Sequence, residues 1–201
     1  ALQAQAEAAI GESPPDMRPR LEGVMSAARR LSHLVDQLLA LARAEPTAAL
    51  ASEEIALADL IHQVAETWLP AAIARGVDLG FEIEPVRVRG SALLLGELLG
   101  NLLDNAIRHA PAGGVVNVGC GRQGGTAWIV VEDDGPGLAD DERERIFERF
   151  YQARRSPGEG SGLGLAIVRQ IARQHGGQVV AARSGRLGGA EFRVTLPAIG
   201  G

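Results

Sequence analysis

The chain has 201 residues, a formal net charge of −5 and a pI near 5.4, which argue against a broad nucleic-acid-binding surface. Its 46% hydrophobic content suits one globular domain with a smaller appendage, and the single cysteine, Cys120, excludes an intramolecular disulfide and suits a reducing cytosol. All 20 basic residues are arginine, so the phosphate-binding lysine of a Walker A loop is missing.

The beginning of the chain is typical of helix. Residues 1–10 have a helical composition without a start signal, so we expect a piece cut from a longer protein. The sequence shows no apolar run long enough to span a membrane and no signal peptide, and we expect no membrane contact from this part. Residues 11–15 break this first helix, and Asp16 can cap a second one that runs to about Arg43.

The second helix carries apolar residues at alternating steps of four and three, which is the period of a coiled coil or a narrow helical bundle. A hairpin this short cannot bury such a seam alone, so the pattern favours a homodimer in which a second chain completes four helices. The alternative is packing of the seam on the chain's own second domain. The seam consists of Met17, Leu21, Val24, Ala28, Leu31, Val35, Leu38 and Ala42.

A linker over residues 45–54 separates the helical part, residues 1–44, from a second domain over residues 55–201. The strand patterns of this domain come in antiparallel-looking pairs, and the helices do not alternate strictly with them. We therefore expect an α+β fold, a two-layer α/β sandwich with a mixed sheet and its helices on one face. Helices are expected over residues 56–74, 91–110 and 163–175, and strands over 77–83, 86–89, 115–120, 127–132, 178–182 and 191–196.

One face of the second of these helices is polar, because Glu97, Asn101, Asn105 and His109 recur every four residues. Two amide oxygens one turn apart can complete the shell of a Mg²⁺ ion whose other ligands are phosphates and water, and the neighbouring Arg108 can reach a phosphate. A solvated helix face is the alternative. Asparagine is a mediocre helix former, however, and two of them within one helix favour a functional role.

Glycines mark two further segments. Gly135 and Gly137 allow a sharp turn after Asp133, whose carboxylate could select adenine through its exocyclic amine; an ordinary Asp-Gly turn is the alternative. The glycine-rich run 158–164 precedes a helix, whose backbone N–H groups suit phosphates, and its spacing does not fit the dinucleotide-binding pattern. We expect the arginine-rich segment between these two to be a mobile lid over a triphosphate.

Taken in order, residues 101–106, 133–137, 146–151 and 160–165 resemble the N, G1, F and G2 boxes of sensor histidine kinases, which share the Bergerat ATP-binding fold. The resemblance covers nearly the whole chain. It implies a histidine protein kinase that moves the γ-phosphoryl group of ATP to a histidine on the helical hairpin. From there the group passes to an aspartate of a response-regulator receiver domain. It also implies a cytoplasmic location for this part, with an inner-membrane sensor as the parent.

The resemblance assigns roles to individual residues. It implies that Asn105 holds Mg²⁺ with the assistance of Asn101, that Asp133 binds the adenine amine and that Arg108 meets a phosphate. Arg149 is the implied catalytic residue, because it approaches the terminal phosphate. The remaining implied nucleotide-binding residues are His109, Gly135, Gly137, Gly160, Gly162, Leu163 and Gly164.

Three departures from the family pattern stand out. None of the four histidines lies in the family's phosphoacceptor box, so the hairpin is partial and we expect this fragment to bind ATP without autophosphorylating. Position 152 is glutamine where the family often has arginine. Residues 188–191 lack the hydroxyl that often precedes the last strand.

The sequence leaves two alternative functions. An ATPase of the gyrase, Hsp90 or MutL type needs a glutamate base at the position of Asn101, and Glu97, one turn earlier, would be displaced by about 6 Å along the helix. The other alternative is a degenerate module that only binds ATP or partner proteins, against which the complete nucleotide motifs argue.

Overall fold

The computed structural model describes residues 17, 52–153 and 161–200. Contacts divide the chain into two units, Ala1–Leu39 and Ala40–Gly201, and nearly all of the described residues belong to the second. The predicted helical hairpin, its heptad seam beyond Met17 and most of the predicted linker lie outside the described residues.

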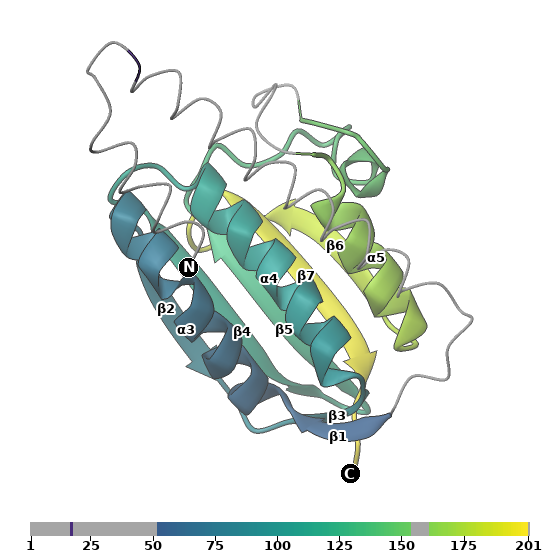
Figure 1. Cartoon of the computed structure of the whole chain (residues 1–201). Coiled ribbons are helices and arrows are strands. Elements are labelled where there is room, and N and C mark those ends of the chain that lie inside the picture. Colours follow the sequence, from purple (N-terminus) through teal and green to yellow (C-terminus); the bar gives the residue numbers. More distant parts are fainter. Residues whose placement is uncertain (1–16, 18–51, 154–160, 201) are drawn as a thin grey trace. The chain divides into compact units, whose positions relative to one another are not determined.

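A five-stranded mixed sheet forms one layer of the domain, with the strand order β2-β4-β5-β7-β6 (Figure 1). The pair β2 and β4 is parallel, and the other neighbours in this sheet are antiparallel. A separate antiparallel pair joins β1 to β3. The strands are β1 (Glu53–Ala56), β2 (Asp78–Ile83), β3 (Arg87–Gly90), β4 (Val115–Gln123), β5 (Thr126–Asp133), β6 (Gln178–Arg183) and β7 (Ala190–Pro197).

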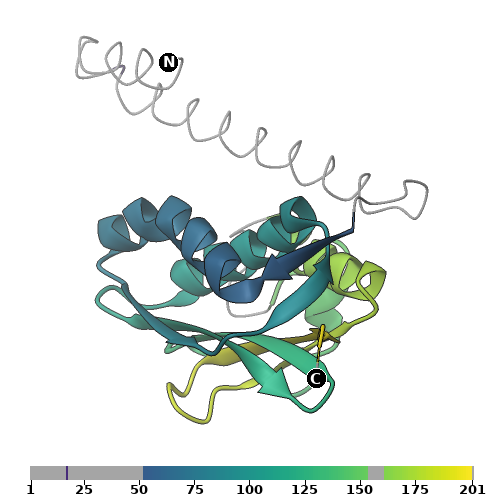
Figure 2. The same cartoon turned by 90° about the horizontal axis from the view of Figure 1, so that it is seen from below.

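Three helices form the second layer, and all three lie on the same side of the five-stranded sheet (Figure 2). They are α3 (Leu57–Arg75), α4 (Ala92–His109) and α5 (Gly164–Gln174). None of the described helices covers the other face of the sheet. The predicted α+β architecture, a mixed sheet with helices on one face, is therefore confirmed.

Local signals in the sequence set the helix ends. Ser91 caps α4 through its side-chain oxygen, which accepts a hydrogen bond from the Leu94 N–H (3.4 Å), and the helix ends before Pro111. Gly76 follows α3 with a φ of +68°, a conformation that residues with a Cβ rarely adopt. The chain can therefore turn directly from α3 into β2.

The core lies between α4 and the sheet. Leu98 and Leu102 of α4 are fully buried, and on β5 the buried Ile129 and Val131 alternate with side chains of the opposite face. Burying one such side chain contributes roughly 1.5–3 kcal/mol. Since the leucines hold one face of α4 against the sheet, the polar stripe of the helix is directed away from it.

His175 joins the end of α5 to the start of α4. Its Nε2 accepts a hydrogen bond from the Ser91 N–H (3.1 Å), and its Nδ1 donates to the Ile171 carbonyl (2.8 Å). A Cβ at Gly90 would lie 2.2 Å from the imidazole ring, so only glycine leaves room for this contact. The N-cap residue of α4 and the last turn of α5 are thus held together.

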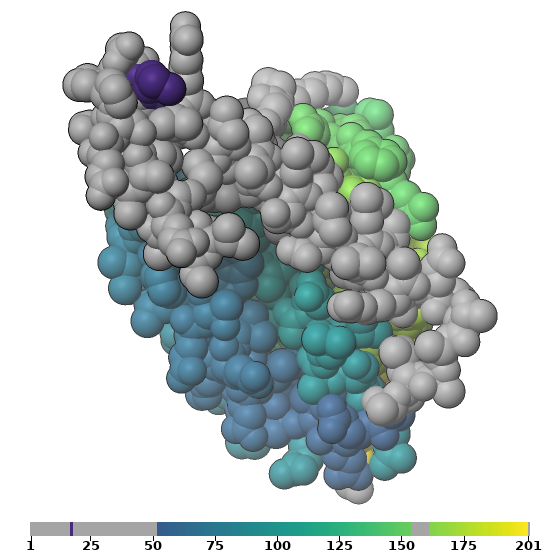
Figure 3. All heavy atoms as spheres, in the orientation of Figure 1, coloured from purple at the N-terminus to yellow at the C-terminus, as the bar shows by residue number. Residues whose placement is uncertain are grey.

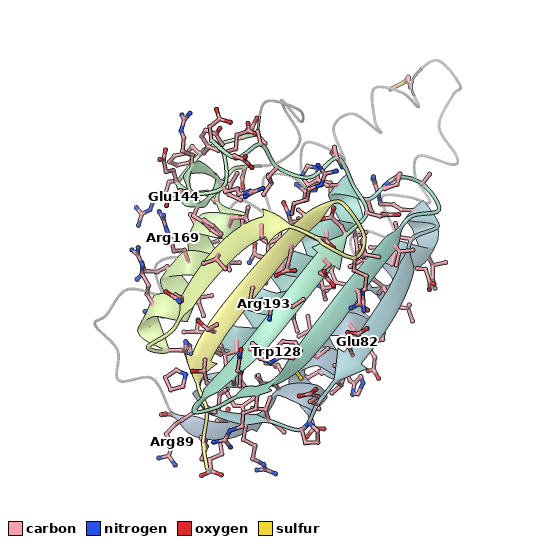
Figure 4. All side chains as sticks on the ribbon, turned by 180° about the vertical axis from the view of Figure 1, so that it is seen from behind. Glu82, Arg89, Trp128, Glu144, Arg169 and Arg193 are labelled. Carbon is pink, nitrogen blue, oxygen red and sulfur yellow. The ribbon has the colours of Figure 1, made fainter. Side chains whose placement is uncertain are left out.

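The two tryptophans lie in different layers of the domain. Trp68 of α3 packs against α4 at Gly100, where a Cβ would lie 3.3 Å from the indole nitrogen. Trp128 lies on the opposite side of the sheet, over Gly119 of the neighbouring strand, with the Arg193 guanidinium 5.4 Å from the centre of its ring (Figure 4). The ring and the cation shield part of the sheet face that carries no described helix.

One strand was missed in the sequence. Glu53 and Glu54, which the sequence places at the end of the linker, begin strand β1 and pair with Gly90 and Arg89 of β3. Ile55 of this strand is buried. Within the part of the chain that the structure describes, no helix is long and apolar enough to cross a lipid bilayer.

Candidate nucleotide-binding site

Segments far apart in the sequence meet where α4 and β5 end. The turn after β5 approaches the end of α4 so closely that a Cβ at Gly135 would lie 2.5 Å from the His109 carbonyl oxygen. A Cβ at Gly137 would lie 3.3 Å from the carbonyl oxygen of Gly189, in the turn between β6 and β7. The fold therefore brings the G1 turn against the end of α4 at His109 and against the turn between β6 and β7.

Asp133 is the most buried acidic side chain of the described residues, with 1% of its surface exposed. Its Oδ1 accepts hydrogen bonds from the N–H groups of Gly135 (2.9 Å) and Ala190 (3.1 Å). Its Oδ2 is buried without a hydrogen-bond partner among the described residues. A buried acceptor without a donor is unfavourable by about 1–3 kcal/mol, so this oxygen is prepared for a donor from a ligand.

The pKa of Asp133 is raised above its ordinary value, mainly because burial disfavours the charged form. The N–H groups of Ala190 and Gly135 oppose this shift, and the neighbouring charge of Asp134 adds to it. A donor supplied to the second carboxylate oxygen would stabilise the ionised form.

The turn before β7 also supports Asp133 through its backbone. The Gly189 N–H donates to the Asp133 carbonyl oxygen (3.2 Å). A Cβ at Gly189 would lie 2.3 Å from that oxygen and 2.5 Å from Oδ1 of the same residue. Sequence reasoning treated residues 188–191 only as a segment without a hydroxyl, and it missed the role of their N–H groups. The adjacent glycines before the last strand were the signal for a close backbone approach.

The polar stripe of α4 is ordered by contacts within the helix. The side-chain amide of Asn101 donates to the Glu97 carbonyl (2.8 Å), and both Asn101 and Asn105 are partly exposed. Arg108, for which the sequence suggests a phosphate contact, forms an ion pair with Asp104 one turn earlier. Asn101 and Asn105 thus lie one turn apart on the partly exposed side of the helix, as the sequence predicts.

The segment 138–153, which is the described part of the expected lid, is anchored to the core in its middle. Ile146 and Phe147 in the 3₁₀ turn Arg145–Phe147 are buried, and the Phe147 ring packs edge-on against Phe192 of β7 at 6.4 Å between ring centres. Arg149, the predicted catalytic residue, is exposed. In the space-filling view the green segment lies beside the few yellow-green atoms that are visible there (Figure 3).

The start of α5 meets this segment at Gly162, which has a φ of +70°. Its carbonyl accepts the Phe150 N–H (2.8 Å), and a Cβ at this position would lie 2.7 Å from the Phe150 backbone. Leu163 is buried, and Gly164 begins the helix without a side-chain cap from the described residues. The N–H groups of this first turn can therefore meet an anion. Gly160 lies outside the described residues.

The sequence model of the histidine kinase-, DNA gyrase B- and HSP90-like ATPases matches residues 90–199. This range contains α4, the turn after β5, α5, the turn between β6 and β7, and the last strand. The chain belongs to this family. Asp133, the two asparagines of α4 and the start of α5 all lie within the matched range.

Among curated proteins, this ATPase-family chain is similar to sensor kinases. It is 37% identical to the sensor protein kinase PmrB of Pseudomonas aeruginosa over 199 residues, which cover 98% of this chain and 42% of PmrB. It is 34% identical to the sensor histidine kinase CusS of Escherichia coli K12 over 203 residues, with the same coverage of 98% and 42%. The chain thus spans less than half the length of these relatives.

Solved structures of this family have the same fold. A mycobacterial sensor histidine kinase, MprB, is 30% identical and superposes with a TM-score of 0.68, over 73% of this chain and 98% of MprB. Full-length ShkA, solved in complex with AMPPNP, is 29% identical with a TM-score of 0.76, over 93% of this chain and 40% of ShkA. The predicted resemblance to sensor histidine kinases and the predicted Bergerat ATP-binding fold are confirmed.

The raised pKa of Asp133 makes a prediction about stability. An acid with a raised pKa in the folded state loses stability as the pH rises from its unfolded pKa, 3.8, through its folded pKa. Asp133→Asn removes this loss. We expect the unfolding free energy of the variant, relative to wild type, to increase as the pH rises above 3.8 and then to level off. Urea unfolding at several pH values measures it, and a difference independent of pH would contradict it.

Proposed function

We propose that this chain is the ATP-binding catalytic part of a sensor histidine kinase. It would transfer the γ-phosphoryl group of ATP to a histidine, from which the group passes to an aspartate of a response-regulator receiver domain. The observation that supports this most directly is the buried Oδ2 of Asp133, which has no partner among the described residues. The exocyclic amine of adenine is a donor of the right kind for this oxygen, whereas guanine presents a carbonyl at that position.

In this proposal, polar groups of α4, the start of α5 and Arg149 hold the phosphates and Mg²⁺. Asn105, assisted by Asn101, would place an amide oxygen on Mg²⁺, and the first turn of α5 would meet the phosphates. The described residues contain no cluster of three His, Cys, Asp or Glu side chains that could hold a metal. Phosphate oxygens would therefore supply most of the Mg²⁺ ligands that the protein does not provide. Arg149 would approach the terminal phosphate, where positive charge stabilises the transition state.

The remaining parts of the proposal concern the whole protein. Residues 1–44 would form part of a dimerisation and phosphotransfer hairpin, residues 45–54 a linker and residues 55–201 the catalytic domain. The homodimer would form through the hairpin, and this part would face the cytoplasm below an inner-membrane sensor. None of the four histidines lies in the family's acceptor box, so this fragment alone should bind ATP without phosphorylating itself.

Titration with a fluorescent ATP analogue, with and without Mg²⁺, tests the nucleotide site. The wild type should bind saturably, with competition by ATP and stronger binding in Mg²⁺. Asn105→Ala should lose most of the gain from Mg²⁺, about tenfold in affinity or ~1.4 kcal/mol, and keep its Mg²⁺-free binding.

The control is Gln63→Ala, which removes an exposed amide from α3 and should behave as wild type. A wild type that fails to bind at millimolar concentrations would contradict the proposed function for this fragment. An Asn105→Ala variant with an unchanged response to Mg²⁺ would remove the metal role of this residue alone.

A further inference from the structure

The turn between β6 and β7 is held by two consecutive residues of β5 whose side chains point to opposite faces of the sheet. On the side of the helices, Asp133 accepts hydrogen bonds from the turn: Oδ1 from the Ala190 N–H (3.1 Å) and the carbonyl from the Gly189 N–H (3.2 Å). On the other side lies Glu132, which is 8% exposed. Strand β5 therefore contacts the turn between β6 and β7 on both faces of the sheet.

Glu132 is held by the turn itself. Its Oε1 accepts a hydrogen bond from the Ser184 hydroxyl (2.8 Å), and its Oε2 lies 3.7 Å from the Arg186 guanidinium. Arg186 also forms an ion pair with Glu82 of β2, one of the side chains on the sheet face without described helices (Figure 4). A buried carboxylate with these partners fixes the start of the turn to the sheet.

Ser184 also organises the turn internally. Its hydroxyl oxygen accepts hydrogen bonds from the N–H groups of Leu187 (2.9 Å) and Arg186 (3.3 Å). The Ser184 N–H donates to the Gly189 carbonyl (2.9 Å), which closes the turn. One hydroxyl thus links the bend of the turn to Glu132.

We propose that Ser184 and Glu132 are positioning residues for adenine recognition, acting through the turn on the carboxylate of Asp133. The inference rests on the proposed function, in which the Oδ2 of Asp133 receives the adenine amine. The tight contact at Gly189 transmits the position of the turn, because a Cβ there would lie within 2.5 Å of two Asp133 atoms. If the turn shifts, Oδ1 loses the Ala190 N–H and the carboxylate rotates toward the remaining donor at Gly135, away from the amine.

The test compares two nucleotides that differ only in the amine, ATP and purine riboside triphosphate. For the wild type we expect ATP to bind about tenfold more tightly, the value of one hydrogen bond to a charged group. Ser184→Ala should reduce this ratio to about two or less and change the affinity for purine riboside triphosphate little. Ser184→Thr, which restores the hydroxyl, should return the ratio to the wild-type value.

Thr195→Ala is the matched control, since it removes a hydroxyl from β7 on the same face of the sheet as Glu132. A folded Ser184→Ala variant with the wild-type ratio would overturn the inference. If that variant does not fold, Ser184→Val, which has the shape of Ser184→Thr but no hydroxyl, takes its place, and a wild-type ratio in it would overturn the inference equally. A wild type that binds both nucleotides equally would instead contradict the role of Asp133 in the proposed function.

Discussion

Asp133→Asn is expected to weaken ATP binding by roughly 10- to 100-fold, the loss of a hydrogen bond to a charged acceptor. The amide oxygen can keep the bonds from the N–H groups of Gly135 and Ala190, which Oδ1 accepts in the wild type. The amide NH₂ then replaces Oδ2 and faces the amine of adenine, so two donors meet. A nearly isosteric change of one group is enough to reverse the hydrogen-bond pattern of the site.

Isothermal titration with ATP measures this effect, and Asp78→Asn, the same change at an exposed position at the start of β2, is the control. Because the variant no longer ionises a buried carboxyl, it should stay folded at neutral pH while it loses affinity. Equal affinities of wild type and Asp133→Asn for ATP would show that this residue does not contact adenine.

Gly189→Ala is expected to damage both stability and nucleotide binding. The added methyl group would lie 2.3 Å from the Asp133 carbonyl oxygen and 2.6 Å from the Gly135 nitrogen, and both are backbone atoms that cannot turn aside. Overpacking of this kind destabilises a fold by about 1–3 kcal/mol, which lowers the melting temperature of a domain this size by several degrees. The displaced carboxylate should weaken ATP binding at the same time.

Gly185→Ala serves as the control in the same turn. A Cβ at Gly185 would meet nothing within 4 Å, and its φ is not positive, so the melting temperature and the ATP affinity should stay close to wild type. Calorimetric melting of the two variants side by side tests the prediction. Equal melting temperatures for Gly189→Ala and wild type would mean that the turn yields more easily than its contacts indicate.

Most of the fold could be predicted from the sequence because its signals are local. The leucines of α4 recur at helical spacing, Ser91 caps the helix and Pro111 follows its end. Strand β1 was missed because its four residues include two glutamates and show no alternation. Only the pairing with β3, which places Ile55 opposite Val88, makes these residues a strand, and pairing across more than 30 residues has no local signal.

The candidate site likewise has a part that could be predicted from local sequence motifs and a part that could not. Asp133 and the two asparagines of α4 could be located because each lies in a motif of a few residues. The anchoring of residues 138–153 could not be predicted, since it depends on Phe147 meeting Phe192 across 45 positions of sequence. The hydrogen bond between Glu132 and Ser184 could not be predicted either, because the two residues lie 52 positions apart in the sequence. The strand pattern indicates only that the Glu132 side chain points to the face opposite that of Asp133, since alternate side chains of a strand point to opposite faces.

The placement of the two tryptophans equips the domain with a pair of optical reporters. Trp68 lies against α4 at Gly100, next to Asn101, whereas Trp128 lies on the far side of the sheet under Arg193. Since the chain has no other tryptophan, replacing either one by phenylalanine leaves a single emitter in a known layer. Emission from Trp68 then follows events along the polar stripe, and emission from Trp128 follows the sheet independently of them.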